Sequence, residues 1–117
     1  MNVVEIERIV PVASAMLKAL GNGHRLMIVA YLLHGEMNVG ELGRAIGLSQ
    51  SALSQHLARL RQDGLVQTRR QAQTIYYSLR GSEARALVAA LVDIYGEKAG
   101  DTAQPQPFRE TAQVNAR

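Results

Sequence analysis

The spacing of hydrophobic residues along the chain predicts five helices. Apolar side chains recur every three or four positions, the period at which residues share one face of a helix. This pattern predicts helices at about 11–20, 25–33, 39–46, from a cap at Ser49 to Asp63, and at about 83–95. Because Pro11 lacks the backbone N–H that a helix interior requires, the apolar residues before it are expected to form only a loose turn.

The third and fourth helices are joined by a very short segment. Gly47 is expected to take the left-handed position after a helix end, Leu48 to point into the core and Ser49 to cap the next helix. Two helices joined by a tight glycine turn are the signature of a helix-turn-helix. The fourth helix is then the recognition helix.

A β-hairpin is predicted directly after the recognition helix. Residues 65–70 and 74–79 alternate polar and apolar side chains and are rich in Thr, Tyr and Ile, with a turn at 71–73. A basic hairpin in this position is a wing. The sequence therefore predicts a mainly α winged helix-turn-helix domain with the order α-α-α-α-β-β-α, dimeric through its first and last helices.

The predicted recognition helix has two different faces. Leu53, Leu57 and Leu60 fall on one side, whereas the opposite side carries short polar and basic residues without a carboxylate. A helix that enters a DNA groove needs Ser and Gln for base edges and Arg for phosphates. The alternative is an ordinary surface helix that happens to lack acidic residues.

Candidate DNA contacts follow from position on this helix and on the hairpin. The first turns of a recognition helix lie deepest in the groove, which selects base-reading candidates, and the arginines are candidates for phosphates. His56 is open between a phosphate contact and a packing role, and one of two adjacent tyrosines must point inward. The candidates are Ser49, Gln50, Ser51, Ser54, Gln55, His56, Arg59, Arg69, Arg70, Gln71, Thr74 and Tyr76.

The last helix is apolar on two sides, which is more than a small monomer can cover. We therefore expect it to form a dimer interface together with the first helix. The interface candidates are Met16, Leu17, Leu87, Val88, Leu91, Val92 and Tyr95. Residues 1–96 are expected to form one DNA-binding and dimerisation domain. From 97 to 117 the helical period is lost, and a flexible tail is expected.

Composition and charge narrow the function further. The chain has a net charge of +3 and no cysteine, which excludes disulfides and thiolate chemistry. The positive charge is concentrated in residues 49–80, with five basic side chains against one acidic. No secretory leader or membrane span is evident, so a cytoplasmic protein is expected. The three histidines match no ligand spacing, and neither a metal nor a cofactor is expected.

Three consecutive motifs carry a resemblance to a known family. They are GLSQSALSQHLARLR at 47–61, DGLVQTRR at 63–70 and QTIYYSL at 73–79. With the helices around them, they resemble the winged-helix repressors of the ArsR/SmtB family, within it the HlyU, NolR and BigR-like branch. The resemblance implies a homodimer that binds an imperfect palindrome near a promoter and blocks transcription. It also implies that the fourth helix reads the major groove while the hairpin follows phosphates or the minor groove.

The chain departs from the family's sensing members. Where metal sensors hold two thiolates in the third helix, this chain has Asn38 and Gly40, and no histidine lies between 83 and 95 for the family's other zinc site. Where thiol sensors hold a cysteine pair, it has Ala30 and Gly96. The resemblance therefore does not extend to any known sensing site.

The sequence favours a homodimeric DNA-binding repressor that is not an enzyme. Two alternatives remain open: a winged-helix module that binds an acidic protein, and a DNA-binding regulator with a small-molecule effector. Catalysis is disfavoured because there is no glycine-rich phosphate loop and no cluster of Asp, Glu and His that would assemble a reactive site.

Overall fold

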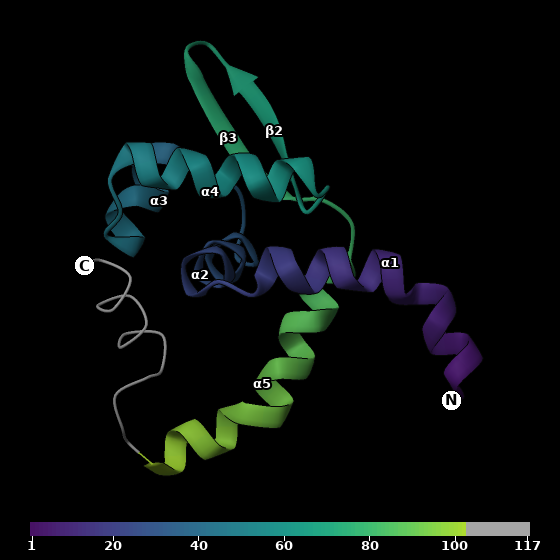
Figure 1. Cartoon of the computed structure of the whole chain (residues 1–117). Helices are drawn as coiled ribbons and strands as arrows, with labels where there is room; N and C mark the ends of the chain where they lie inside the picture. The colour runs from purple at the N-terminus through teal and green to yellow at the C-terminus, as the bar shows by residue number, and fades with distance from the viewer. Residues whose placement is uncertain (103–117) are drawn as a thin grey trace.

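The computed structural model describes the backbone of residues 1–102 and the side chains through Glu97. Its elements are α1 (Val3–Leu20), α2 (Gly23–Leu32), β1 (Met37–Asn38), α3 (Val39–Ile46), α4 (Gln50–Gln62), β2 (Val66–Gln71), β3 (Thr74–Leu79) and α5 (Glu83–Thr102). The hairpin of β2 and β3 rises beyond α4 on one side of the molecule, and α5 lies on the other side of α1 and α2 (Figure 1). This arrangement confirms the predicted winged helix-turn-helix.

The core is built by aliphatic side chains from every long element. Leu42 from α3 and Leu53, Leu57 and Leu60 from α4 are at most 1% exposed and meet Ile28 of α2. The predicted leucine face of α4 is therefore confirmed. Full burial of each such side chain stabilises the fold by about 1.5–3 kcal/mol, so this seam fixes how α4 is presented.

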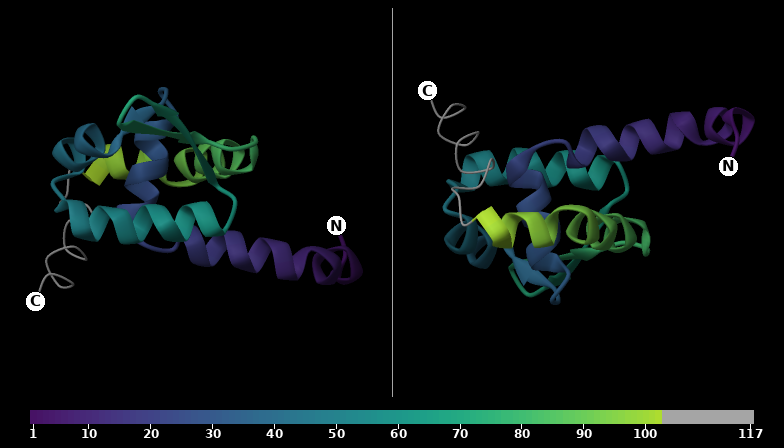
Figure 2. Two further views of the ribbon diagram at one scale, coloured as in Figure 1. Left: turned by 90° about the horizontal axis from the view of Figure 1, so that it is seen from above. Right: turned by 90° about the horizontal axis from the view of Figure 1, so that it is seen from below.

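The first helix differs from the prediction, because α1 begins at Val3 and runs through Pro11. A capping box starts it, in which the Asn2 side chain accepts a hydrogen bond from the Glu5 N–H at 2.9 Å and the Glu5 carboxylate accepts one from the Asn2 N–H at 2.9 Å. The cap stabilises the first turn of a helix in which Pro11 cannot donate a backbone hydrogen bond. The helix changes direction in its N-terminal half, as expected around an internal proline (Figures 1 and 2).

The turn between α3 and α4 has the predicted geometry. Gly47 has φ +83°, and both its own N–H and that of Leu48 donate to the Gly43 carbonyl, at 2.7 and 3.2 Å. The Ser49 hydroxyl then accepts the Ala52 N–H at 3.2 Å and starts α4. These caps set the angle between the two helices of the helix-turn-helix.

The sheet has one strand more than predicted. β1 pairs antiparallel with β3, with Met37 opposite Tyr77 and Asn38 opposite Tyr76, and gives the order β1-β3-β2. A two-residue strand is too short to show an alternating pattern, so the sequence could not reveal it. The strand β1 anchors the base of the wing to the start of α3.

The turn of the hairpin suggests a stabilising substitution. Gln71 pairs with Thr74, so Ala72 and Gln73 form a two-residue turn, and Ala72 has φ +56°. A left-handed conformation is costly for alanine but not for glycine. We expect Ala72→Gly to raise the free energy of unfolding by about 0.5–1 kcal/mol, measured by chemical denaturation. A decrease would show that the turn is not strained.

The last helix also differs from the prediction, since α5 continues past Tyr95 to Thr102 and contains the expected domain boundary at 96. Glu97, Lys98 and Ala99 are good helix formers, although Gly96 and Gly100 beside them are not. The remainder of the expected tail, 103–117, lies outside the described residues. Among the helices that the structure describes, none is long and apolar enough to cross a membrane.

Candidate nucleic-acid interface

The exposed face of α4 presents the predicted base-reading residues. Gln50, Ser51, Ser54 and Gln55 are all solvent-exposed, and of these Ser51 and Gln55 lie opposite the buried leucines. Because α4 is capped at its start and pinned by that core, these polar side chains project from a rigid helix. Such a helix can enter a major groove without rearrangement.

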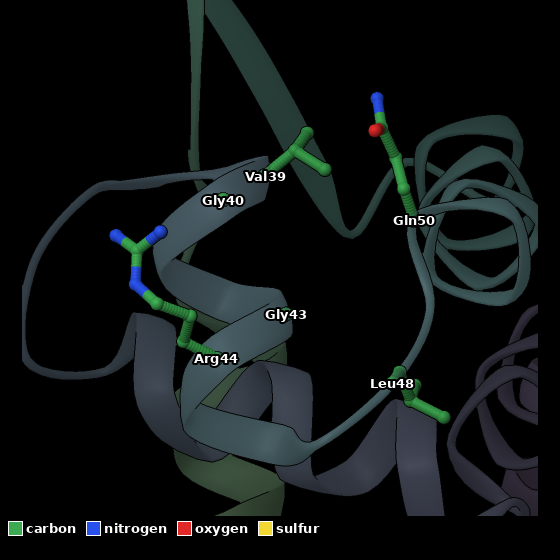
Figure 3. A pocket seen from close by; sticks show the side chains of 6 residues that line it. All are labelled: Val39, Gly40, Gly43, Arg44, Leu48 and Gln50. Atoms are coloured by element: carbon green, nitrogen blue, oxygen red, sulfur yellow. The ribbon is translucent and has the colours of Figure 1, made fainter.

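A depression of about 320 Å³ lies between α3 and the start of α4, bounded by Gly40, Arg44 and Gln50 (Figure 3). A neighbouring depression of about 360 Å³ extends from Gly40 and Gln50 to Gln73 and Thr74 at the hairpin turn. Together they form a concave strip that links α3, α4 and the wing. In Figure 3, Gln50 extends beside Val39 at the opening, and Arg44 extends from the other side of α3.

The strip is also lined by three residues that were not predicted from the sequence, Gly40, Arg44 and Gln73. A Cβ at Gly40 would lie 3.4 Å from both the Arg44 guanidinium and the Asn38 side-chain oxygen, so glycine leaves the strip open there. The only signal available was the basic character of Arg44 in a helix-turn-helix. Only the fold shows that Arg44 and Gln50 line the same depression.

On the wing, Arg69 is held by three side chains. Its Nε donates to Glu36 Oε2 at 3.2 Å, its Nη2 donates to Glu36 Oε1, and its Nη1 donates to Gln71 Oε1 at 2.9 Å. The guanidinium carbon lies 4.7 Å from the centre of the Tyr76 ring. The hydrogen bonds from Arg69 lower the pKa of the Glu36 carboxyl, and Glu36 raises the pKa of Arg69. The Arg69 guanidinium is thus held in one orientation on the wing.

The other wing candidates lie in different environments. Arg70 and Gln71 are exposed at the end of β2, whereas Thr74 is half-buried in the strip. Tyr77 packs against the core while Tyr76 lies under Arg69, which confirms that one tyrosine points inward.

Two candidates on α4 are engaged within the protein. Arg59 donates through Nε to Asp63 Oδ2 at 2.8 Å. The half-buried His56 has its Nδ1 3.4 Å from Nη1 of Arg25, and its ring centre lies 5.6 Å from that of His24. For His56 the packing alternative is favoured. DNA contact by each selected residue stays a prediction.

Arg25 connects the recognition helix to the first helix. Its Nε donates to the Ala19 carbonyl at 2.6 Å and its Nη2 to the Lys18 carbonyl at 3.3 Å, at the C-terminal end of α1. Burial and then the nearby Arg59 lower the pKa of Arg25. This side chain therefore satisfies terminal carbonyls of α1 while it contacts His56 on α4.

This contact predicts an acid-sensitive contribution to stability. Burial of the ring lowers the pKa of His56, and positive charge on Arg25 and His24 lowers it further. The unfolded chain therefore takes up this proton first, and stability is lost as the pH falls through the ordinary value of 6.5 toward the lowered one. We expect the unfolding midpoint to fall more between pH 7.5 and 5.5 in the wild type than in His56→Gln. Equal falls would contradict this role.

An apolar groove runs between α1 and α5 on the side away from the wing. It has a volume of about 510 Å³ and is bounded by Met16 and Leu17 from α1 and by Leu87 from α5. Leu17, Val92 and Tyr95 are 59–60% exposed. Val88 differs from the prediction, since it is only 9% exposed and belongs to the core of the protomer. The other interface candidates remain available to a second copy.

No grouping of three or more potential metal ligands occurs among the side chains that the structure describes. His24 and His56 lie near each other, but the Arg25 guanidinium beside His56 adds positive charge there. Cations are disfavoured at such a place.

Comparisons with known proteins give one consistent result. A family model described as "Bacterial regulatory protein, arsR family" matches residues 22–68. The transcriptional activator HlyU of Vibrio cholerae is 50% identical over 95 residues, which cover 81% of this chain and 88% of HlyU. The structure of the transcriptional repressor BigR from Xylella fastidiosa has a TM-score of 0.77 at 41% identity and covers 81% of this chain and 97% of its own. A homodimeric winged helix-turn-helix DNA-binding domain from Mycobacterium bovis has a TM-score of 0.70 at 31% identity. The match covers 78% of this chain and 84% of the M. bovis domain.

Proposed function

The chain belongs to the arsR family of bacterial regulatory proteins, and from this premise we propose that it is a repressor that binds an imperfect palindromic operator as a homodimer. Its membership makes it a DNA-binding transcription regulator and not an enzyme, with double-stranded DNA and a second copy of itself as partners. Because a bacterial DNA-binding regulator meets its DNA inside the cell, we propose that it acts in the cytoplasm.

One observation carries the proposal. The exposed face of α4 has Gln and Ser but no carboxylate, and the hairpin with Arg69 and Arg70 rises beside it on the same side of the molecule (Figure 1). The helix can read base edges while the hairpin contacts the backbone. The apolar groove between α1 and α5 supports pairing of two such surfaces by a symmetric interface.

The test is a selection of fragments of the native genome by the purified protein. We expect enrichment of an inverted repeat whose half-sites are centred about 34 Å apart, or a multiple of this. Absence of any enriched repeat would contradict the proposal. Transcription in vitro from an enriched promoter then separates repression from activation, since HlyU is named an activator and BigR a repressor.

We further propose that the operator affinity does not respond to thiol-reactive agents or metals. The chain has no cysteine, Asn38 serves as the helix cap of α3, and the family resemblance implies that Ala30 and Gly96 take the positions where thiol sensors hold cysteine. Titration with arsenite, cadmium, zinc, peroxide or polysulfide is expected to leave operator affinity within about twofold, a change of less than about 0.5 kcal/mol. A tenfold loss with zinc alone would instead indicate a site at His24, His34 or His56.

A further inference from the structure

We infer that Glu36 is a specificity-determining residue, which lowers the affinity of the wing for random DNA more than its affinity for the operator. The inference rests on the proposed function. Glu36 lies in the segment between α2 and β1, and it meets Arg69 of β2 across 33 residues of sequence. It was not among the candidates selected from the sequence.

The contact leaves Arg69 able to donate to DNA. A guanidinium has five N–H groups, and Glu36 and Gln71 together accept from three of them. One N–H remains on each terminal nitrogen, and the side chain is 49% exposed. Arg69 can therefore donate to one phosphate while Glu36 still holds its other edge.

The same contact removes the long-range charge of Arg69. Affinity for random DNA arises from cations that displace counterions from the phosphates, and it depends on net charge more than on geometry. Glu36 and Arg69 together carry no net charge, so each wing contributes mainly Arg70 to this attraction. Because Tyr76 and Gln71 also restrict the guanidinium, Arg69 is suited to a phosphate at one fixed position.

The operator complex should respond differently when Glu36 is neutralised. There the recognition helix fixes the position of the wing, so an oriented Arg69 loses little side-chain freedom on binding. Without Glu36, a gain in charge is opposed by a loss of this orientation. For random DNA only the gain in charge remains, and the ratio of the two affinities should fall.

The experiment compares the wild type with Glu36→Gln on two probes. One is a 40-base-pair duplex carrying the site most enriched from the genome, and the other is a scrambled duplex of the same length and composition. For Glu36→Gln we expect the affinity for the scrambled duplex at 0.15 M salt to rise about fivefold for each wing in contact, with a salt slope steeper by about 0.9 per wing. Affinity for the operator should change by less than about twofold, because the gain in charge and the loss of Arg69 orientation nearly cancel.

Two controls distinguish this role from simple support of the fold. In an Arg69→Gln background, Glu36→Gln should raise the affinities for both duplexes alike and leave their ratio unchanged, because it removes a carboxylate without releasing or disordering an arginine. Glu97→Gln removes the same charge from the exposed part of α5 and should change neither affinity by more than about twofold.

The outcomes separate the two hypotheses. If the wild type prefers the operator but Glu36→Gln binds the scrambled duplex no more tightly, or binds both duplexes more weakly, the role of Glu36 is wrong and the proposed function stands. If the wild type does not distinguish the two duplexes, the proposed function itself fails.

Discussion

Substitution of Leu17 by glutamate is expected to convert the dimer into a monomer and to weaken operator binding by about 100-fold or more. Leu17 lies on the apolar groove between α1 and α5 and is 60% exposed in the protomer, so a carboxylate can remain hydrated there in the monomer. In a symmetric dimer it would be buried twice without a partner. Loss of the second half-site removes the gain of about 10²–10⁴ that two linked contacts provide.

Light scattering and a binding titration test this expectation together. The monomer has a mass of 12.8 kDa, and Leu17→Met serves as a matched control that keeps an apolar side chain at the same place. The control should remain a dimer with nearly normal affinity. A Leu17→Glu dimer would show that the interface lies elsewhere, and a tight-binding monomer would show that dimerisation is not required.

Truncation of Gln55 is expected to reduce discrimination between the operator and scrambled DNA by about 1–3 kcal/mol, the range for a bidentate contact with a base. Gln55 is exposed on the rigid face of α4, two positions after the buried Leu53 and two before the buried Leu57. Gln55→Ala should leave binding to scrambled duplex unchanged, because it removes no charge.

The measurement is the ratio of affinities for the two duplexes at fixed salt. Gln62→Ala provides the control, since Gln62 is also exposed on α4 but lies in its last turn, away from the part that enters the groove deepest. If Gln55→Ala preserves the ratio, Gln55 does not read a base.

Local features of the sequence were sufficient to predict the helix-turn-helix. The left-handed turn at Gly47, the helix cap at Ser49 and the helical spacing of the three leucines each involve only residues that are close in sequence. The same holds for the wing, because its two strands are adjacent in the chain and are joined by a two-residue turn. Motifs of this kind also carried the family resemblance that the comparisons confirmed.

Features that depend on contacts between distant segments were decided by the tertiary structure. Pairing with β3 creates the two-residue β1, and Glu36 reaches Arg69 only because the sheet brings residues 33 positions apart together. Arg25 likewise joins the end of α1 to His56, and the packing of α5 buries Val88 within its own protomer. A charged or apolar side chain has several possible partners in a sequence, and only the fold selects among them, because hydrogen bonds and burial depend on positions in space rather than on spacing along the chain.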